Sequence, residues 1–517
     1  RAPSVNFALE RTRGMSLLGI DLGTSNCKCV AFRENGDVIV QSSVSYTPYS
    51  KHPDWMEIDA EVFWDAFVKT VRTVSAWLSD DPVTALAISS QGETIIPVDR
   101  SGIPVCPTLM NADNRAKPQI EELEHRLGRR RIYDITGLPL DTTFGGTKMM
   151  WLRENQPDVY ARTAKFLSCE DFILMRLGLG AYSSKCLCCR TLLMDVRRRE
   201  WSREMLDAMG IDPGKLSEPV SSGQLIGRLD AQTAAILGLH EGVGVAAAGH
   251  DQCCSILGSG VTRDNTASDA AGTYEGVSLL TNTADTSDFA FESGINTYCH
   301  LFDDQFLSLA FFPSGFAMNW MMDLLRYNNA PTTKGELFAR LDAEVATLGD
   351  GPTGVFVLPH FVGSCSPYYD RRATGTVVGL TPNASPVVLY KAIYESIAYE
   401  FAAMTRLLSH LGEYEAVHIS GGGSKSDFTL RLRASISGKK ICRASSSDSV
   451  CQGAAMLAGM ATGVYRDRDD AVKKAIRLSH YFLPQQAVKE AYRNCEAMYH
   501  EIYRSLTPVR DRWRDIV

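Results

Sequence analysis

The chain has 517 residues, more than one hydrophobic core normally organises, so we expect two large domains with a ligand cleft between them. Its composition, 45% hydrophobic and 22% charged, is that of a globular protein. A formal net charge of -7 gives no reason to expect nucleic acid as a partner, and no window is apolar over the length of a membrane span.

The 14 cysteines are spread through a long chain without an apolar signal segment, which favours reduced thiols and a cytoplasmic location. The tightest group is Cys186, Cys188 and Cys189. It lacks paired CxxC spacing and a neighbouring His, so core packing is favoured over zinc binding. Residues 1–14 precede a start at Met15 and show little apolar pattern, and we interpret them as a leader or a tag remnant.

The first ordered segment, residues 17–40, predicts a three-strand meander. Its first turn is Gly23-Thr24-Ser25, directly after Asp21. Glycine lets the backbone approach a ligand closely, backbone amides and hydroxyls can donate to phosphate oxygens, and Asp21 can reach a hydrated Mg²⁺. The turn therefore has the parts of a nucleotide site on a hairpin, and no Walker loop occurs elsewhere in the chain.

Apolar spacing from Val62 to Val74 predicts a helix within residues 52–74, and a strand expected at 85–89 leads into Gln91-Gly92-Glu93-Thr94. Polar residues at a strand end commonly meet ligands. Helices are expected at 116–128, 147–153, 157–164 and 169–177, which makes the first domain α/β with a helical insertion. A buried strand at 243–248 then delivers His250, Asp251 and Gln252 to a loop that opens the helix 253–257.

The sequence after residue 266 resembles the start of the first domain: the segment DAAGT at 269–273 is similar to DLGT at 21–24, which suggests an internal duplication. Further strands are expected at 355–358, 416–419 and 440–444, and helices at 387–408, 427–437, 452–462 and 486–506. The strand at 416–419 ends in Gly421-Gly422-Gly423.

Taken in order, the segments GIDLGTS, QGET, NADNR, TTFGGTKMMWLRENQPDVY, CCRTLLMDVRRREW, AAGHDQ, AAGTYEG, HISGGGSKSDF and QGAAMLAG resemble the FGGY carbohydrate kinases. That family belongs to the superfamily of sugar kinases, actin and large heat-shock chaperones. The resemblance implies an α/β fold of two actin-like (ribonuclease H-like) domains with an interdomain cleft, at 15–262 and 263–482, followed by a C-terminal helix within 483–517. It also implies ATP and Mg²⁺, a sugar or polyol substrate, and a homodimer.

The resemblance carries roles onto matching residues. Asp21 matches the carboxylate that holds Mg²⁺ through water, and Asp251 the catalytic base. The cofactor-binding residues would be Gly23, Thr24, Ser25, Gly272, Thr273, Gly315, Gly421, Gly422, Gly423 and Ser426. The substrate-binding residues would be Gln91, Glu93, Asp113, Arg115, Thr143 and Gln252. Each glycine group alone could be a tight turn, and His250 is a rival for the base because its unperturbed pKa lies near neutrality.

Several positions depart from the family pattern. The Arg that precedes the matching Glu in glycerol kinases is Gly92 here, their substrate-contacting Tyr is Thr143, and the usual Trp of WxDxR is Asn111. Smaller residues predict a wider pocket, so we expect an acceptor of about four to six carbons: a sugar, ketose or polyol, including linear acceptors such as the dione of autoinducer kinases. The alternative function is a nucleotide-dependent conformational module of the actin or chaperone type, which would have no small acceptor.

Overall fold

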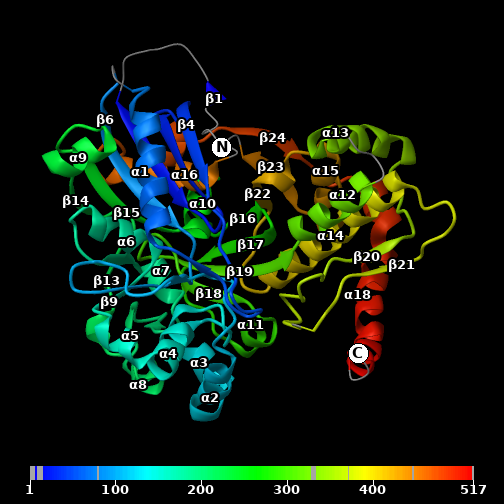
Figure 1. Ribbon diagram of the computed structural model, residues 1–517. Helices are drawn as coiled ribbons and strands as arrows, with labels where there is room; N and C mark the ends of the chain where they lie inside the picture. Colours follow the sequence, from blue (N-terminus) through cyan, green and yellow to red (C-terminus); the bar gives the residue numbers. More distant parts are fainter. Residues whose placement is uncertain are drawn as a thin grey trace.

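The structure is a computed structural model that describes residues 6–7, 15–78, 81–327, 333–370, 372–444 and 448–514. Two seven-stranded sheets, one from each half of the chain, lie side by side with helices around them (Figure 1). No helix in these ranges is both long and apolar enough to cross a membrane. Most of the residues expected to form a leader lie outside the described ranges, but Asn6–Phe7 forms β1 and pairs with β4.

The first sheet has the order β1-β4-β3-β2-β6-β15-β14. Its antiparallel strands β2, β3 and β4 are the expected meander, and β6 and β15 run parallel to β2 in the middle of the sheet. The strands are β2 Ser16–Leu22, β3 Asn26–Arg33, β4 Val38–Ser45, β6 Val83–Ser90, β14 Leu225–Arg228 and β15 Gly244–His250.

The second sheet has the order β18-β19-β17-β16-β22-β23-β24. Its strands are β16 Thr266–Ala271, β17 Tyr274–Thr281, β18 Asn296–Cys299, β19 Phe306–Pro313, β22 Ala416–Ser420, β23 Lys440–Ala444 and β24 Leu478–Phe482. An antiparallel run, β16 to β18, is again followed by two parallel strands and one antiparallel edge strand. The five strands β4-β3-β2-β6-β15 of the first sheet and β19-β17-β16-β22-β23 of the second therefore share one topology, which supports the duplication suggested by the echo of the first turn, while the outermost strands differ in their chain order.

The remaining elements cover these sheets or form the insertion after β6. The helices are α1 Glu61–Ser75, α2 Lys117–Leu127, α3 Arg129–Thr136, α4 Gly145–Asn155, α5 Pro157–Arg162, α6 Cys169–Arg176, α7 Lys185–Cys189, α8 Arg203–Met209, α9 Ala231–Leu237, α10 Asp251–Gly258, α11 Asp288–Glu292, α12 Gly315–Tyr327, α13 Lys334–Val345, α14 Pro386–Ser409, α15 Asp427–Ser437, α16 Ser449–Ala461, α17 Arg468–Ala475 and α18 Gln486–Arg514. Short strand pairs are β5 Glu57–Ile58 with β8 Thr108–Leu109, β7 Ile96–Val98 with β9 Lys165–Leu167, β10 Tyr182–Ser184 with β13 Glu218–Val220, β11 Met194–Asp195 with β12 Glu200–Trp201, and β20 Phe356–Leu358 with β21 Thr376–Val378.

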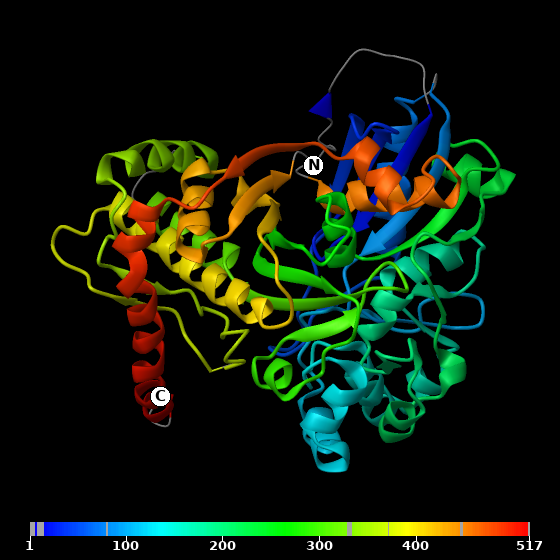
Figure 2. The same cartoon turned by 180° about the vertical axis from the view of Figure 1, so that it is seen from behind.

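Helices α10 and α16 join the two halves. Although α16 follows β23 of the second sheet, it packs on β2, β6 and β15 of the first and against α10 (Figure 2). The contact is close enough to require glycine. A Cβ on Gly258 would lie 1.9 Å from the carbonyl oxygen of Ser449, and one on Gly453 would lie 2.0 Å from that of Cys254. This crossing holds the base of the cleft.

Two expectations about elements need correction. Asp251 and Gln252 are not in a loop but form the first turn of α10, where a carboxylate is favoured because the helix dipole is positive at its N-terminus. The last helix, expected at 486–506, continues to Arg514 and passes through Pro508. It runs along the outer side of the second half (Figure 1).

Candidate active site

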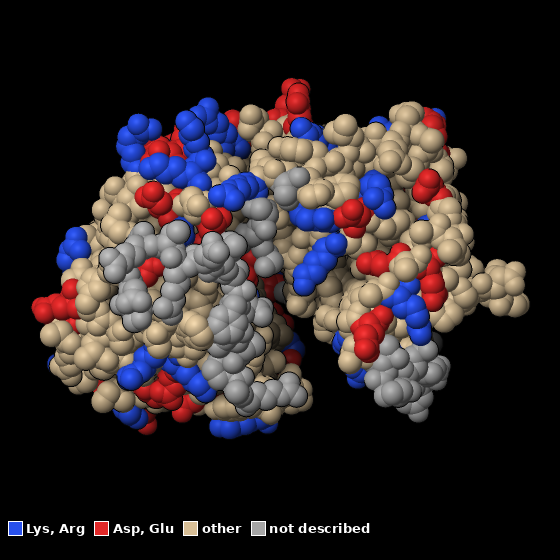
Figure 3. All heavy atoms as spheres, turned by 90° about the horizontal axis from the view of Figure 1, so that it is seen from above, with Lys and Arg blue, Asp and Glu red and all other residues tan. Residues whose placement is uncertain are grey.

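A cavity of about 760 Å³ lies between the two halves of the molecule. The first half contributes the β2–β3 turn, the end of β6 and the β15–α10 junction, and the second half contributes residues 270–274, 364–369 and 448–451. A hollow between the two lobes is visible from above (Figure 3). Of the predicted site residues, ten line it: Asp21, Thr24, Gln91, Glu93, Thr143, Asp251, Gln252, Gly272, Thr273 and Gly421.

The first turn is held from behind by Tyr46, whose hydroxyl donates to the carbonyl oxygens of Gly23 at 2.6 Å and Asn26 at 3.0 Å. The Thr24 hydroxyl donates to Oε1 of Gln91 at 2.9 Å and accepts from Nδ2 of Asn111 at 3.1 Å. Thr24 thus lines the cavity and connects the β2–β3 turn to the segment after β6. The side chain of Ser25 is exposed beside it and does not line the cavity.

Asp21 lies at the floor of the cavity, at the end of β2. Its Oδ1 is buried and has no hydrogen-bond partner among the described residues. Burial raises the pKa of Asp21 to about 7; Lys28 acts against this rise and Asp448 adds to it. A buried carboxylate oxygen without a donor fits a hydrated cation. No group of three or more His, Cys, Asp or Glu side chains in the described ranges is arranged to hold a metal directly.

Asp251 projects from the start of α10 and is held by two donors. Its Oδ1 accepts from the backbone N–H of Gln252 at 2.6 Å and lies 3.2 Å from Nε2 of His250. Burial raises the pKa of Asp251 to about 6, against the opposing effect of His250. The Asp251 carboxylate is therefore mostly ionised at neutral pH.

His250 is neutral because burial lowers its pKa to about 4. Its Nδ1 lies 3.2 Å from the hydroxyl of Tyr298, and its Nε2 faces Asp251. Asp251 can only accept, so Nε2 carries the proton and Nδ1 accepts from Tyr298. Both ring nitrogens are then engaged, which favours Asp251 over His250 as the base.

Glu93 has a backbone φ of 63°, a conformation that costs a non-glycine residue energy and that clusters at functional sites. Its Oε1 accepts from Nε of Arg190 at 2.5 Å. The guanidinium of Arg190 is buried between the rings of Phe144 and Tyr298, at 5.0 and 4.8 Å. Arg190 also lines the cavity, although it was not among the predicted site residues. Arg190 lies in the segment CCRTLL, which is part of the resemblance to the family, and this segment could have identified it as a site residue.

Two further residues, Thr143 and Lys148, lie near Glu93. The Thr143 hydroxyl donates to the carbonyl oxygen of Asn111 at 2.9 Å. Lys148 donates to the carbonyl oxygens of Glu93 at 3.0 Å and Thr143 at 2.7 Å, and burial lowers its pKa to about 8. Lys148 therefore ties the two predicted substrate segments together from below. Gln252 lines the cavity beside Gly276, which presents no side chain there.

Asp113 and Arg115 do not reach the cavity. Arg115 donates to both carboxylate oxygens of Asp113 and to Oε1 of Glu57, each at 2.8 Å. Its guanidinium lies over the rings of Trp55 and Trp151. These donors and acceptors are satisfied inside the protein, so this structure gives no support to the expectation that the pair contacts substrate. It is a buried ion cluster beneath the site.

The turn at Gly272 and Thr273, predicted to be the second phosphate turn, is packed through glycines. A Cβ on Gly315 would lie 2.4 Å from the carbonyl oxygen of Gly272, and one on Gly421, where φ is +87°, would lie 2.7 Å from that of Ala271. A Cβ on Gly423 would meet Ala271 at 2.8 Å, whereas Gly422 has open space around it. Outside the cavity lining, Ser426 donates to Asp342 at 3.1 Å. Gly272 and Gly421 thus bring two backbone turns together at the cavity wall.

The echo of Asp21 in the second half differs in chemistry. Asp269 is buried and its Oδ2 pairs with Arg433 at 3.1 Å, and Arg433 also pairs with Glu275 at 2.6 Å. A carboxylate engaged in this way is committed to the core. Oδ1 of Asp269 is, like Oδ1 of Asp21, buried without a hydrogen-bond partner among the described residues, but the Asp269 carboxylate is paired through Oδ2 with Arg433 and does not line the cavity, whereas Asp21 does.

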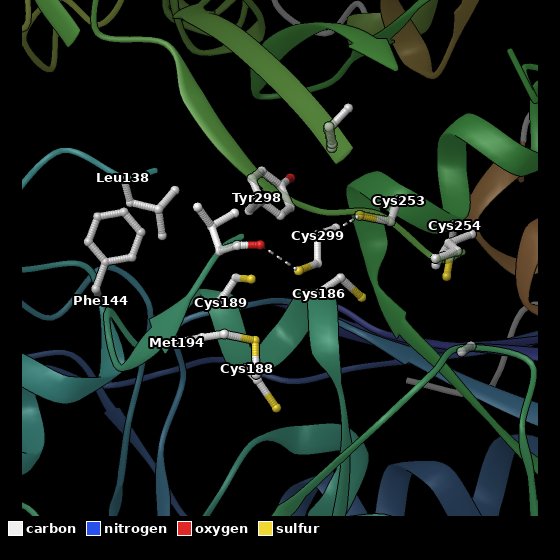
Figure 4. Close-up of a cluster of buried hydrophobic side chains, with 14 of the residues drawn as sticks. Leu138, Phe144, Cys186, Cys188, Cys189, Met194, Cys253, Cys254, Tyr298 and Cys299 are labelled. Atoms are coloured by element: carbon white, nitrogen blue, oxygen red, sulfur yellow. Dashed lines mark hydrogen bonds between the residues drawn. The ribbon is translucent and has the colours of Figure 1, made fainter. Parts of the chain in front are cut away.

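A sulfur-rich core lies under the β15–α10 junction, formed by Cys186, Cys188, Cys189, Cys253, Cys254 and Cys299 (Figure 4). The backbone N–H of His250 donates to the sulfur of Cys186 at 3.2 Å. Burial raises the pKa of the Cys188, Cys253 and Cys254 thiols well above its usual range. All 14 cysteines are free, and this group packs as predicted from its spacing.

Two domains that share this five-strand core and enclose a cavity between them define the actin-like class of ATP-binding folds. Residues 16–258 match the model of the FGGY family of carbohydrate kinases, N-terminal domain, and residues 305–462 match that of its C-terminal domain. These matches cover more than half of the chain. The chain belongs to the FGGY family of carbohydrate kinases, and it is an ATP-dependent sugar or polyol kinase.

Individual relatives agree with this assignment. The chain is 24% identical to a xylulose kinase of Staphylococcus xylosus over 490 residues, which covers 94% of this chain and 99% of the relative. It is 29% identical to a glycerol kinase of Shewanella amazonensis over 490 residues, covering 92% and 95%. The crystal structure of a ligand-bound xylulose kinase from Lactobacillus acidophilus has the same fold, with a TM-score of 0.87, 21% identity, and coverage of 96% and 100%.

Proposed function

We propose that the protein transfers the γ-phosphoryl group of ATP to a hydroxyl of a sugar, ketose or polyol of about four to six carbons, with Asp251 as general base. The observation that carries this proposal is the position of Asp251: an ionised carboxylate at the end of β15, in the same cavity as both phosphate turns and Glu93. The conformational-module alternative has no use for a base and a hydroxyl clamp at that place.

The base role rests on geometry and protonation. Asp251 keeps Oδ1 bonded to the Gln252 amide, so its orientation is fixed, and its second oxygen is available to a hydroxyl. A pKa of about 6 leaves the carboxylate charged at neutral pH. It can take the hydroxyl proton as the bond to phosphorus develops. Neutral His250 keeps its proton on Nε2 and steadies Asp251.

The orphaned oxygen of Asp21 supports a place for Mg²⁺ held through water. Bound there, Mg²⁺ would neutralise charge on the transferring phosphoryl group. The backbone turns at Gly23 and Gly272 would approach the phosphates from the two halves, and Gly421 to Gly423 would lie against the adenosine. Helices α10 and α16 pack on each other, and they contact the strands β16 and β2 that lead to the turns at Gly272 and Gly23.

The acceptor length rests on small side chains. Asn111, Ala112 and Thr143 line the acceptor end, and Gly276 leaves space beside Gln252. The space next to Gly92 does not add to it, because a Cβ there would lie 3.0 Å from both Arg190 and His250. Gly92 lines the cavity, but Arg190 and His250 occupy the space that a larger side chain would need there, so the proposal depends on the other four residues.

ATP turnover measured with and without a panel of acceptors tests this function. The panel should hold glycerol, tetritols, pentitols, ketopentoses and hexitols, with the phosphorylated product identified by phosphorus NMR. We expect turnover only with an acceptor. Acceptor-independent hydrolysis at the same rate throughout the panel would support the conformational alternative and overturn the kinase proposal.

A further inference from the structure

The cavity wall opposite Glu93 is formed by the second half of the molecule. Tyr369 lines the cavity there and has a backbone φ of 45°, which makes it one of four non-glycine residues with positive φ among the described ranges. Such strain persists only where surrounding structure holds it. Its ring packs edge-on against Phe311 at 5.9 Å and fills the space over Gly294, where a Cβ would lie 2.2 Å from the ring.

A hydrogen-bonded chain runs from Tyr369 to Glu93. The Tyr369 hydroxyl lies 2.7 Å from Nδ2 of Asn296, at the start of the edge strand β18. Oδ1 of Asn296 lies 3.5 Å from Nη1 of Arg190, which in turn donates to Glu93. These hydrogen bonds connect the second half of the molecule to the first, so the positions of Tyr369 and Glu93 are coupled.

The direction of these bonds is fixed by the arginine. Arg190 can only donate, so the oxygen of the Asn296 amide must face it, and the nitrogen must face Tyr369. Tyr369 therefore accepts from Asn296 and keeps its own phenolic proton. No acceptor for that proton is recorded in the part of the chain that the structure describes. Burial raises the pKa of Tyr369 well above its usual range, so the proton is retained.

We propose that Tyr369 is a specificity-determining residue whose hydroxyl donates to an oxygen of the acceptor beyond the one held by Glu93. This inference rests on the proposed function. It predicts an acceptor with a hydroxyl or carbonyl oxygen at the end remote from the phosphorylated position. Recognition of that end then depends on both halves of the molecule, because Tyr369 and Glu93 come from different halves.

The test compares variants and acceptors together. Tyr369→Phe removes only the hydroxyl, and kcat/KM is measured for a favoured pentitol or ketose and for its analogue that lacks the terminal hydroxyl. We expect the variant to lose about three- to tenfold on the full acceptor, the usual effect of one neutral hydrogen bond, and nothing on the deoxy analogue. KM for ATP should not change.

Tyr368→Phe is the matched control. The hydroxyl of this neighbouring tyrosine lies 3.2 Å from Nδ1 of His500, its ring stacks on Tyr503, and it does not line the cavity. Its loss should affect both acceptors equally or not at all. If Tyr369→Phe behaves like this control, or lowers kcat/KM equally for both acceptors, the specificity role is wrong. Calorimetric binding of the two acceptors separates that result from a folding defect.

The two proposals fail in different ways. A wild-type protein that phosphorylates no acceptor in the panel overturns the proposed function, and the role of Tyr369 with it. A wild-type protein that phosphorylates acceptors, but treats the full and deoxy compounds alike, overturns only the role of Tyr369.

Discussion

Arg190 donates from Nε to Oε1 of Glu93 at 2.5 Å, and its side chain lies against Gly92, where a Cβ would be 3.0 Å from Cγ of Arg190. Compared with glycerol kinases, the sequence lacks the arginine that precedes this glutamate and has Gly92 in its place. The structure supplies a guanidinium to the same glutamate from a segment 97 residues further along the chain. A side chain at position 92 would crowd the aliphatic part of Arg190 and the ring of His250, which fits glycine at this position.

Arg190→Gln should therefore weaken the acceptor site. Glu93 would remain buried without its cation, and removing one partner of such a pair is costly. We expect kcat/KM for the acceptor to fall on the order of 10- to 100-fold with KM for ATP little changed. Steady-state kinetics in both substrates measures this. The control is Arg131→Gln, which breaks an exposed pair with Glu204 and should have no effect.

Asp251→Asn tests the base. The amide keeps the size of the side chain but cannot take a proton, so we expect kcat to fall on the order of a hundredfold or more while nucleotide binding is retained. Single-turnover assays and calorimetry with a non-hydrolysable nucleotide measure the two quantities. A variant with near-normal kcat would remove Asp251 from the mechanism and return His250 as the candidate.

The same variant has a pH signature. The pKa of Asp251 is about 6 in the folded protein against an ordinary 3.8, so the folded state binds more protons between these values and stability falls as pH rises from about 4 to 6. Without ligands, Asp251→Asn should melt at a higher temperature than the wild type at pH 8, and the difference should vanish near pH 4. Activity follows the opposite sign: kcat/KM of the wild type should fall below about pH 6, as the carboxylate is protonated.

The parts of the site that the sequence predicts are local. The turn after Asp21, the strand that leads to Asp251 and the glycine turn at 421–423 each lie within a few residues, and their chemistry is legible from the order of residues. The acceptor wall is not local. Tyr369 lines the cavity, and Asn296 joins it to Arg190 because the edge strand β18 of the second sheet contacts α7 of the insertion in the first half, a contact between segments far apart in the chain.

Asp113 and Arg115 show that a local motif does not determine what surrounds its side chains. Their spacing matches a substrate-binding motif, but whether an aspartate and an arginine face a ligand or each other depends on what surrounds them. Here Glu57 and two tryptophan rings close around Arg115, and these come from segments far from it in sequence. A sequence motif can therefore match a pair of residues although their side chains are buried away from any ligand.

The glycine turn at 421–423 offers a matched pair of substitutions. Gly421→Ala places a Cβ 2.7 Å from the Ala271 carbonyl oxygen at a positive φ, whereas Gly422→Ala meets no atom within 4 Å. We expect Gly421→Ala to displace the second phosphate turn, raising KM for ATP several-fold and lowering the melting temperature. Gly422→Ala should leave both close to wild type, and equal effects of the two would contradict this packing.

Asp21→Ala tests the metal position. If the orphaned oxygen of Asp21 orients a hydrated Mg²⁺, its removal should lower kcat far more than it weakens acceptor binding, because charge on the transferring group is no longer neutralised. Titration of Mg²⁺ at fixed ATP should show a higher requirement in the variant, and calorimetry should show an unchanged affinity for the acceptor. An unaltered Mg²⁺ dependence would exclude Asp21 from this role.

The last prediction concerns acceptor length. A three-carbon acceptor would leave part of the pocket beside Asn111, Thr143 and Gly276 unfilled, and it could not reach both Glu93 and the opposite wall. Unfilled space and an unmet hydrogen bond each cost roughly 1 to 3 kcal/mol, so kcat/KM should favour acceptors of about four to six carbons over glycerol by about tenfold or more. Thr143→Tyr adds bulk where the pocket is open and should shift preference toward glycerol. Glycerol as the best acceptor of the wild type in a broad panel would mean that these small residues do not define the acceptor end.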